Sequence, residues 1–234
     1  MSLDLLVFGP HPDDLEIGLG GAIARHTAEG YTVGLCDLTA GELGSNGTPA
    51  GRMEEGAAAA RVLGAAFRDN LEWPDGAITA TPERVQQAVD LIRRHRPRTV
   101  AIPYWEDRHP DHRAAAEVLD LVAFRAGLRR YVTDLPSWRP DWICYYFVNT
   151  SSPPSFVIDV SAHYARKREA LACHASQFTP AGPDAVPTRL TASTFQQLIE
   201  SRDAQFGARI GVAFAEGVIV HEPVARASLL RSAP

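Results

Sequence analysis

The chain has 234 residues, with 23 basic and 28 acidic side chains and a formal net charge of −5. This length suits one α/β domain with a buried core. The acidic balance offers no basic surface to neutralise phosphates, which argues against a nucleic-acid partner. No apolar stretch approaches the roughly 20 residues of a membrane span, and the N-terminus lacks the positive region of a signal peptide. We therefore expect a cytoplasmic protein without a membrane partner.

The first 130 residues alternate between strand and helix patterns. Short, mostly apolar runs predict strands at residues 3–8, 32–38, 65–71 and 99–103. Helical patterns follow from about residue 15 to 30, at 52–63, from 82 to 97 and at 113–126. This regular alternation implies right-handed crossovers. It predicts a Rossmann-like, mostly parallel α/β sheet with helices on both faces.

The composition changes at about residue 135, where tryptophan, tyrosine and proline become frequent. We expect strands at 143–148, 156–160 and 218–220, and helices at 162–174 and 191–207. No linker precedes this part of the sequence. We therefore predict that residues 131–234 form an α+β extension that completes the sheet and the active-site rim within a single domain over 1–234.

Two histidine–aspartate segments each follow a predicted strand. The first is Gly9-Pro10-His11-Pro12-Asp13-Asp14, and the second ends in Arg108-His109-Pro110-Asp111-His112. In α/β sheets, ligands bind beyond the carboxyl ends of the strands. We interpret the two segments as halves of one metal site.

Spacing suggests roles for these side chains. His11 and Asp14 are three residues apart, so a helical turn places them on one side as a ligand pair. Either His109 or His112 could supply the third ligand, and spacing does not choose between them. Asp13 would be free to act as a general base, and the remaining histidine would hold a proton or an oxyanion. Asp111 would fix the tautomer of that histidine.

Other interpretations of the two segments exist. Asp14 and Asp111 each stand near a helix start and could be N-caps. Two histidines and a carboxylate are also the ligand set of non-haem iron oxygenases. A sugar or nucleotide binding module without turnover is the alternative from another class. The glycines of Gly18-Leu19-Gly20-Gly21 lack G-x-G-x-x-G spacing, which argues against a dinucleotide site.

These residues resemble the LmbE-like or PIG-L family of zinc-dependent deacetylases, which act on N-acetylglucosaminyl compounds. G-P-H-P-D-D-L-E-I-G matches the family's A-H-P-D-D-x-E-x-G, with Pro10 in place of alanine, and R-H-P-D-H matches its H-P-D-H. Weaker similarity runs through most of the chain. The pattern is most similar to the bacillithiol-biosynthesis branch, which deacetylates N-acetylglucosaminyl malate.

The resemblance implies a zinc ion, with ferrous iron as the alternative, held by His11, Asp14 and His112. It also implies Asp13 as base and His109 supported by Asp111. Further matched positions implied to contact the substrate are Glu16, Asn46, Arg52 and Gln177. Arg108 is a second candidate, with Arg52, for binding a substrate carboxylate. Some relatives supply a tyrosine to the oxyanion where this chain has Phe195, and members of this branch assemble as homo-hexamers.

Overall fold

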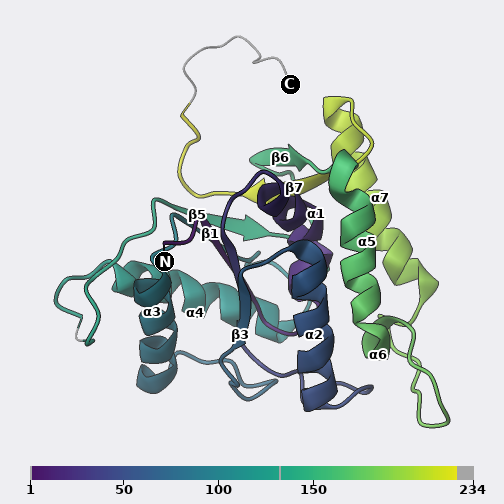
Figure 1. Ribbon diagram of the computed structural model, residues 1–234, viewed down its shortest axis with the longest axis horizontal. Helices are drawn as coiled ribbons and strands as arrows, with labels where there is room; N and C mark the ends of the chain where they lie inside the picture. Colours follow the sequence, from purple (N-terminus) through teal and green to yellow (C-terminus); the bar gives the residue numbers. More distant parts are fainter. Residues whose placement is uncertain (1, 132, 226–234) are drawn as a thin grey trace.

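The computed structural model describes residues 2–131 and 133–225. A seven-stranded mixed sheet lies at its centre, in the order β3-β2-β1-β4-β5-β7-β6 (Figure 1). The strands are β1 (Leu5–Gly9), β2 (Val33–Asp37), β3 (Phe67–Asn70), β4 (Thr99–Pro103), β5 (Trp142–Tyr146), β6 (Phe156–Asp159) and β7 (Ala215–Ile219). The helices are α1 (Asp14–Ala28), α2 (Pro49–Leu63), α3 (Pro82–His95), α4 (Pro110–Ala126), the 3-10 turn η1 (Ser161–His163), α5 (Tyr164–Cys173), α6 (Ala175–Phe178) and α7 (Ser193–Ile210).

The predicted Rossmann-like sheet is confirmed. Strands β1 to β5 are all parallel, and β1 lies between β2 and β4. The C-terminal part completes the same sheet, because β7 pairs antiparallel with both β5 and β6.

Several predicted boundaries differ from the structure. The last strand begins at Ala215, earlier than expected, because Glu216 and Gly217 interrupt the apolar pattern although both are part of β7. Helix α4 begins at Pro110, three residues before the predicted start, so the second motif forms its first turn. The helix expected at 162–174 is divided into η1 and α5.

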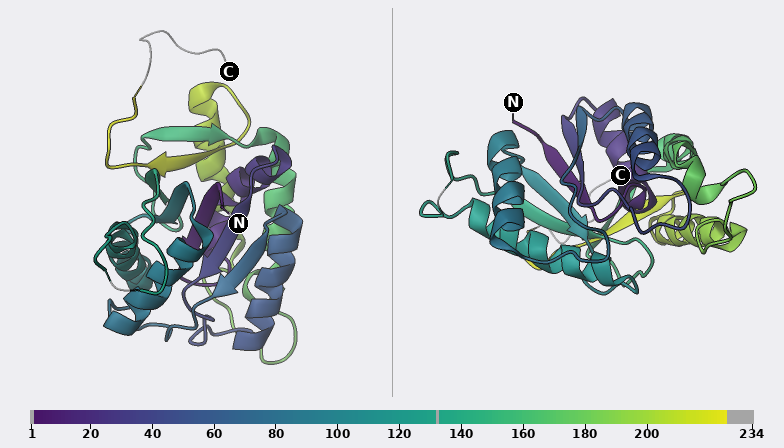
Figure 2. Two further views of the ribbon diagram at one scale, coloured as in Figure 1. Left: turned by 60° about the vertical axis from the view of Figure 1, so that its left-hand side comes forward. Right: turned by 90° about the horizontal axis from the view of Figure 1, so that it is seen from below.

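Two apolar cores lie on opposite faces of the sheet, as alternating strand side chains require. Leu6, Phe8 and Ile102 face the core shared with α3 and α4. Val7 and Ala101 face the core shared with α1, α2 and α5. Figure 2 shows these two helical layers with the sheet between them. This placement leaves the carboxyl ends of β1 and β4 at one open edge.

Glycines allow α1 to lie close against its neighbours. A Cβ atom added at Gly18 would lie 2.1 Å from Cδ2 of Tyr146 on β5, and one at Gly21 would lie 2.7 Å from Cβ of Val160. Each is far inside van der Waals contact, so larger residues are excluded at both positions.

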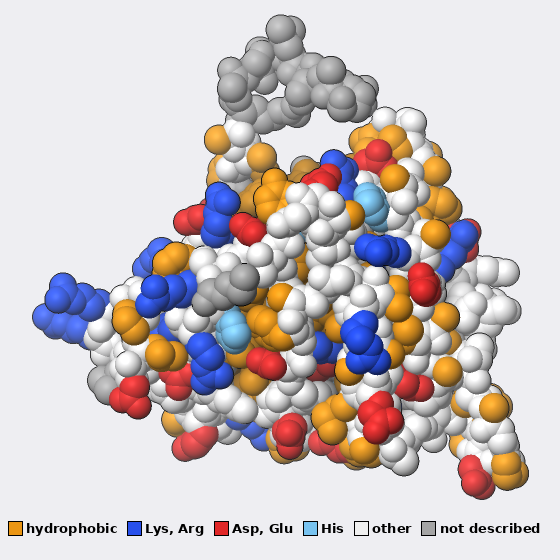
Figure 3. Space-filling model, viewed as in Figure 1, with side chains coloured by type: hydrophobic (Ala, Val, Ile, Leu, Met, Phe, Trp, Pro, Cys, Tyr) orange, Lys and Arg blue, Asp and Glu red, His pale blue; other side chains and the backbone are white. Residues whose placement is uncertain are grey.

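The surface carries mixed charge. On the face shown in Figure 3, basic and acidic side chains are interspersed. Within residues 2–131 and 133–225, no helix is both long enough and apolar enough to cross a bilayer.

Candidate active site

The two motifs meet at the carboxyl ends of two adjacent strands. The first connects β1 to α1, the second connects β4 to α4, and β1 and β4 pair in parallel. Both motifs line a cavity of about 480 Å³, together with Arg52, Asp75 and Phe195. The predicted convergence of the two segments is therefore observed.

The carboxylate of Asp14 lies between two imidazoles. Its Oδ2 atom is 3.1 Å from Nδ1 of His11 and 3.2 Å from Nε2 of His112. Two ligands of a tetrahedral zinc ion, each at about 2.0–2.1 Å, would be separated by roughly 3.3 Å. The donor chemistry of the three side chains and these two separations therefore fit a metal ion. Ring nitrogens of His11, His109 and His112 also lie within 4.8 Å of one another, so the structure allows either histidine of the second motif to contribute.

The other ring nitrogens of His11 and His112 face carboxylates. Nε2 of His11 lies 3.1 Å from Oδ1 of Asp75 and 3.3 Å from Oδ2 of Asp111. Nδ1 of His112 lies 3.2 Å from Oδ1 of Asp107. Such contacts orient metal-binding histidines and fix their tautomers. Sequence reasoning missed Asp75 and Asp107, because neither has a spacing that indicates its partner.

The position of Asp111 differs from the prediction. Its carboxylate faces His11 and accepts a hydrogen bond from the backbone of Gly76, at 2.8 Å, instead of supporting His109. As the second residue of α4, it projects toward the first motif. Asp14 likewise lies in the first turn of α1, whereas the N-cap positions belong to Asp13 and His109. The alternative that Asp14 and Asp111 are N-caps is therefore wrong.

His109 caps α4 and also lines the cavity. Its Nδ1 accepts a hydrogen bond from the backbone of Asp111, at 3.2 Å. A neutral ring that accepts at Nδ1 carries its proton at Nε2. Burial lowers the pKa of His109, and the neighbouring His11 and His112 lower it further. His109 can thus be an N–H donor while uncharged.

Asp13 is buried beside the metal-binding candidates. Its backbone has φ 129°, a strained conformation for a residue other than glycine. Its Oδ2 atom lies 3.3 Å from Nη2 of Arg52. This Nη2 also donates to the carbonyl oxygen of Pro12, and Nη1 of Arg52 donates to that of Gly41. Burial raises the pKa of Asp13 to about 6, against the opposing effect of Arg52. Such a carboxyl is better matched to proton transfer near neutral pH than an exposed aspartate.

Glu16 does not line the cavity. It is fully buried, pairs with Arg68, and has Oε2 3.2 Å from Nε2 of His174. Burial alone would raise its pKa, but Arg68 and His174 hold the pKa at about 2. The substrate contact that the resemblance implied for Glu16 does not agree with this position.

Of the other residues implied to contact the substrate, some line the cavity and others support the residues that line it. Gln177 lines the cavity, and its Nε2 donates to the carbonyl oxygen of Asn46. The Asn46 side chain exchanges two hydrogen bonds with the backbone of Val186 and so supports the nearby wall. Arg108 and Arg189 are exposed residues of the cavity wall. Phe195 also lies there, and among the described residues that line the cavity none is a tyrosine.

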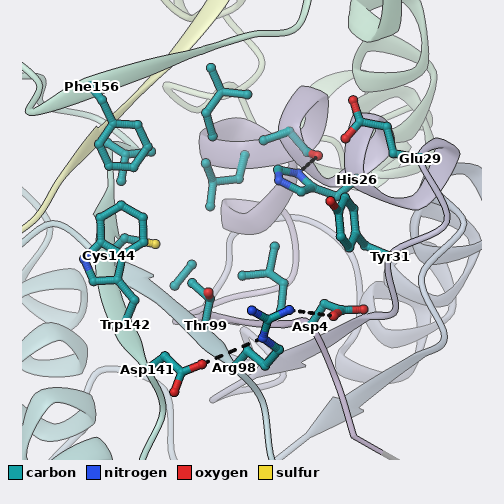
Figure 4. A pocket seen from close by; sticks show the side chains of 16 residues that line it. Asp4, His26, Glu29, Tyr31, Arg98, Thr99, Asp141, Trp142, Cys144 and Phe156 are labelled. Carbon is teal, nitrogen blue, oxygen red and sulfur yellow. Dashed lines mark hydrogen bonds and ion pairs between the residues drawn. The ribbon is translucent and has the colours of Figure 1, made fainter. Parts of the chain in front are cut away.

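A second cavity, of about 450 Å³, opens at the opposite edge of the sheet, where β1, β4 and β5 begin (Figure 4). Its wall is largely apolar, and Arg98 on its rim lies 3.9 Å from Asp4 and 3.7 Å from Asp141. None of the predicted site residues lines it. The candidate active site is therefore the cavity at the carboxyl ends of the strands.

A Rossmann-like sheet with a buried histidine–carboxylate cluster beyond its strand ends defines an α/β protein with a candidate metal centre. Residues 6–123 match the family model described as PIG-L, GlcNAc-PI de-N-acetylase. The chain belongs to this family.

Named relatives agree with this assignment. The chain is 32% identical to a diacetylchitobiose deacetylase of Thermococcus kodakarensis over 190 residues, which cover 74% of this chain and 70% of that protein. It is 27% identical to a probable N-acetyl-alpha-D-glucosaminyl L-malate deacetylase 2 of Bacillus anthracis, over 74% of this chain and 80% of that protein. The crystal structure of the conserved protein TT1542 from Thermus thermophilus superimposes with a TM-score of 0.89 at 37% identity, covering 98% of this chain and 100% of that one.

Proposed function

We propose that this chain is a metal-dependent de-N-acetylase that hydrolyses the acetamide of an N-acetylglucosaminyl conjugate and releases acetate. The observation that carries the proposal is the Asp14 carboxylate between His11 and His112, with the buried Asp13 beside it in the cavity wall. Membership of the PIG-L family supports the same reaction.

His11, Asp14 and His112 would hold the ion. Two imidazole nitrogens and one carboxylate oxygen suit zinc or ferrous iron better than the all-oxygen ions calcium and magnesium. When bound, such an ion would supply Lewis acidity that polarises a carbonyl oxygen and acidifies water. Asp75, Asp107 and Asp111 would hold the two imidazoles in their binding orientation.

The remaining side chains would handle protons and charge. Asp13 would take the proton of the attacking water, because it is a carboxylate next to the ligand set that is not itself placed between the imidazoles. Arg52 would hold the loop that carries it. His109, as an N–H donor on the cavity wall, would stabilise the negative charge that forms on the acetamide oxygen when water attacks the carbonyl carbon. The proton held by Asp13 would then pass to the leaving amine.

We further propose an anionic aglycone, such as malate. Arg108 and Arg189 are exposed on the cavity wall, and a guanidinium binds a carboxylate through two parallel hydrogen bonds. Arg52 is less available, because backbone carbonyls and Asp13 occupy it. The B. anthracis relative is named for a malate conjugate, which is consistent with this choice. A neutral chitobiose substrate, as named for the T. kodakarensis relative, is the alternative.

An acetate-release panel tests the function. The substrates are N-acetylglucosaminyl malate, an N-acetylglucosaminyl inositol, diacetylchitobiose and free N-acetylglucosamine, each with zinc or ferrous protein and with a chelator. We expect release that the chelator abolishes and that is fastest with the malate conjugate. Tight sugar binding without acetate would indicate a binding module, and oxygen consumption with a 2-oxo acid would indicate an iron oxygenase. The homo-hexamer implied by the resemblance stays a prediction, which light scattering tests.

A further inference from the structure

Helix α1 is broken one turn after the metal-binding candidates. Leu19 has φ −134° and ψ 15°, outside the helical region. In an unbroken α-helix the N–H of Gly21 would pair with the carbonyl of Ile17. Here the carboxylate of Glu216 accepts from Gly21 and Ala22, at 2.9 and 2.7 Å. The carbonyl of Ile17 accepts from Arg202 at 2.7 Å and from Lys167 at 3.1 Å.

The side chains at this break form one buried cluster of four charges. Nζ of Lys167 lies 2.6 Å from both Asp203 and Glu216, and Nε of Arg202 lies 3.0 Å from Asp203. Lys167, Asp203 and Glu216 have no exposed surface, and Arg202 is 8% exposed. The positive charges of the two basic side chains balance the negative charges of the two acidic ones. The cluster comes from α5, α7 and β7, which are distant in sequence from both motifs.

Arg202 also contacts the segment that supports the second motif. Its Nη1 donates to the carbonyl oxygens of Phe147 and Val148, each at 3.0 Å. The next residue, Asn149, donates from its backbone and side chain to Asp107, the carboxylate beside His112. One guanidinium therefore contacts the helix that begins with Asp14 and the segment that orients His112.

Stability alone is a weak reason for such a cluster. Replacing a buried charge network by apolar side chains is often neutral or stabilising. A metal site, in contrast, needs its ligands held to within about 0.5 Å. Side chains that fix the position of the first turn of α1, which carries Asp14, relative to the end of β5 would hold the ligands in this way.

We propose that Lys167, Arg202, Asp203 and Glu216 are positioning residues that set the placement of Asp14 relative to His112. The inference rests on the proposed metal site. They act through the backbone of α1 and through the segment 147–149, without contact to the substrate.

The test compares two conservative variants with a matched control. Glu216→Gln keeps the shape but replaces one acceptor oxygen by a donor, and Arg202→Lys keeps the charge but loses the fork that joins the two segments. Arg93→Lys is the control, because Arg93 is also buried and donates to the carbonyls of Ala126, Leu128 and other residues away from the cavity. Zinc affinity is measured by chelator competition, together with kcat, KM and Tm.

We expect both cluster variants to lose about 10–100-fold in zinc affinity, kcat or both, as for other residues that orient metal ligands. KM should change little. Arg93→Lys should lower Tm while zinc affinity and kcat stay at the wild-type values. If Glu216→Gln does not fold, the same measurements on Arg202→Lys alone test the positioning role.

Wild-type zinc affinity and kcat in folded cluster variants, with Tm lowered as in Arg93→Lys, would overturn the proposal and leave the cluster a purely structural role. Failure of the proposed function would be seen separately, as wild-type protein that binds zinc but releases no acetate. The affinity comparison would still test positioning in that case.

Discussion

The carboxylate of Asp107 lies beside the imidazole of His112 and also binds Asn149, in the segment that follows β5. Its Oδ1 atom lies 3.2 Å from Nδ1 of the imidazole, and the same carboxylate accepts from the backbone N–H groups of His109, at 2.8 Å, and Asn149, at 2.9 Å. Burial would raise the pKa of Asp107, but His112 holds it at about 2. One carboxylate thus stabilises the loop and fixes the orientation of a candidate metal ligand.

The first prediction concerns this carboxylate. Asp107→Asn should weaken zinc binding by about 10–100-fold, because the neutral amide no longer orients and polarises His112. Chelator competition measures the effect. Glu106→Gln is the control, since Glu106 is the exposed neighbour and contacts only Tyr104 among the hydrogen bonds described. Equal zinc affinity in the two variants would contradict the assigned role.

Asp13→Asn should keep zinc while kcat falls by about 100-fold or more, as for loss of a general base. Metal analysis of the purified variant and an acetate assay measure the two effects together. Zinc lost along with activity would instead make Asp13 a ligand.

Asp14→Ala should lose zinc. The carboxylate between His11 and His112 is then gone, and two imidazoles alone make a weaker site. Metal content after dialysis is the measurement, and circular dichroism shows whether the fold persists. Full zinc occupancy in the folded variant would refute the ligand assignment.

The Arg108→Gln and Arg189→Gln double variant should raise KM for N-acetylglucosaminyl malate by at least about tenfold, which corresponds to the loss of a charge-assisted pair. KM for diacetylchitobiose should stay nearly unchanged. Arg130→Gln serves as the control, because Arg130 is exposed outside the cavity. A similar rise in KM for both substrates would argue against an anionic aglycone.

Arg68→Met should destabilise the fold by about 3–5 kcal/mol at pH 7, because it leaves the buried carboxylates of Glu16 and Asp37 without their cation. Arg68, together with His174, holds the pKa of Glu16 at about 2, below its ordinary 4.5, so the stabilisation from this pairing is present above pH 4.5 and is lost as the pH falls toward 2. The difference in unfolding free energy from wild type should therefore narrow below about pH 4.5. Urea titrations at pH 7 and 4 measure it, with the exposed Arg61→Met as control. A difference independent of pH would contradict the assigned charge pairing.

The sequence by itself determined the sheet and the location of the candidate site. Apolar runs that alternate with helical patterns require parallel strands with crossover helices, and two motifs at strand exits must then lie at the same edge. These inferences depend on local periodicity and on the handedness of the chain, both of which are written in neighbouring residues.

Only the tertiary structure decided which side chains support that site. Asp75 and Asp107 were missed, Asp111 faces His11 instead of His109, and Glu16 is buried against Arg68. The break in α1 at Leu19 was also not predicted. The glycines on either side of Leu19 disfavour a regular helix, but they do not indicate that Glu216 and Arg202 bind the free backbone groups there. Asp107 and His112 are only five residues apart, but each of the other contacts joins residues separated by tens of positions in the chain. Their pairing is set by how the elements pack in three dimensions, which no local pattern of residue types records.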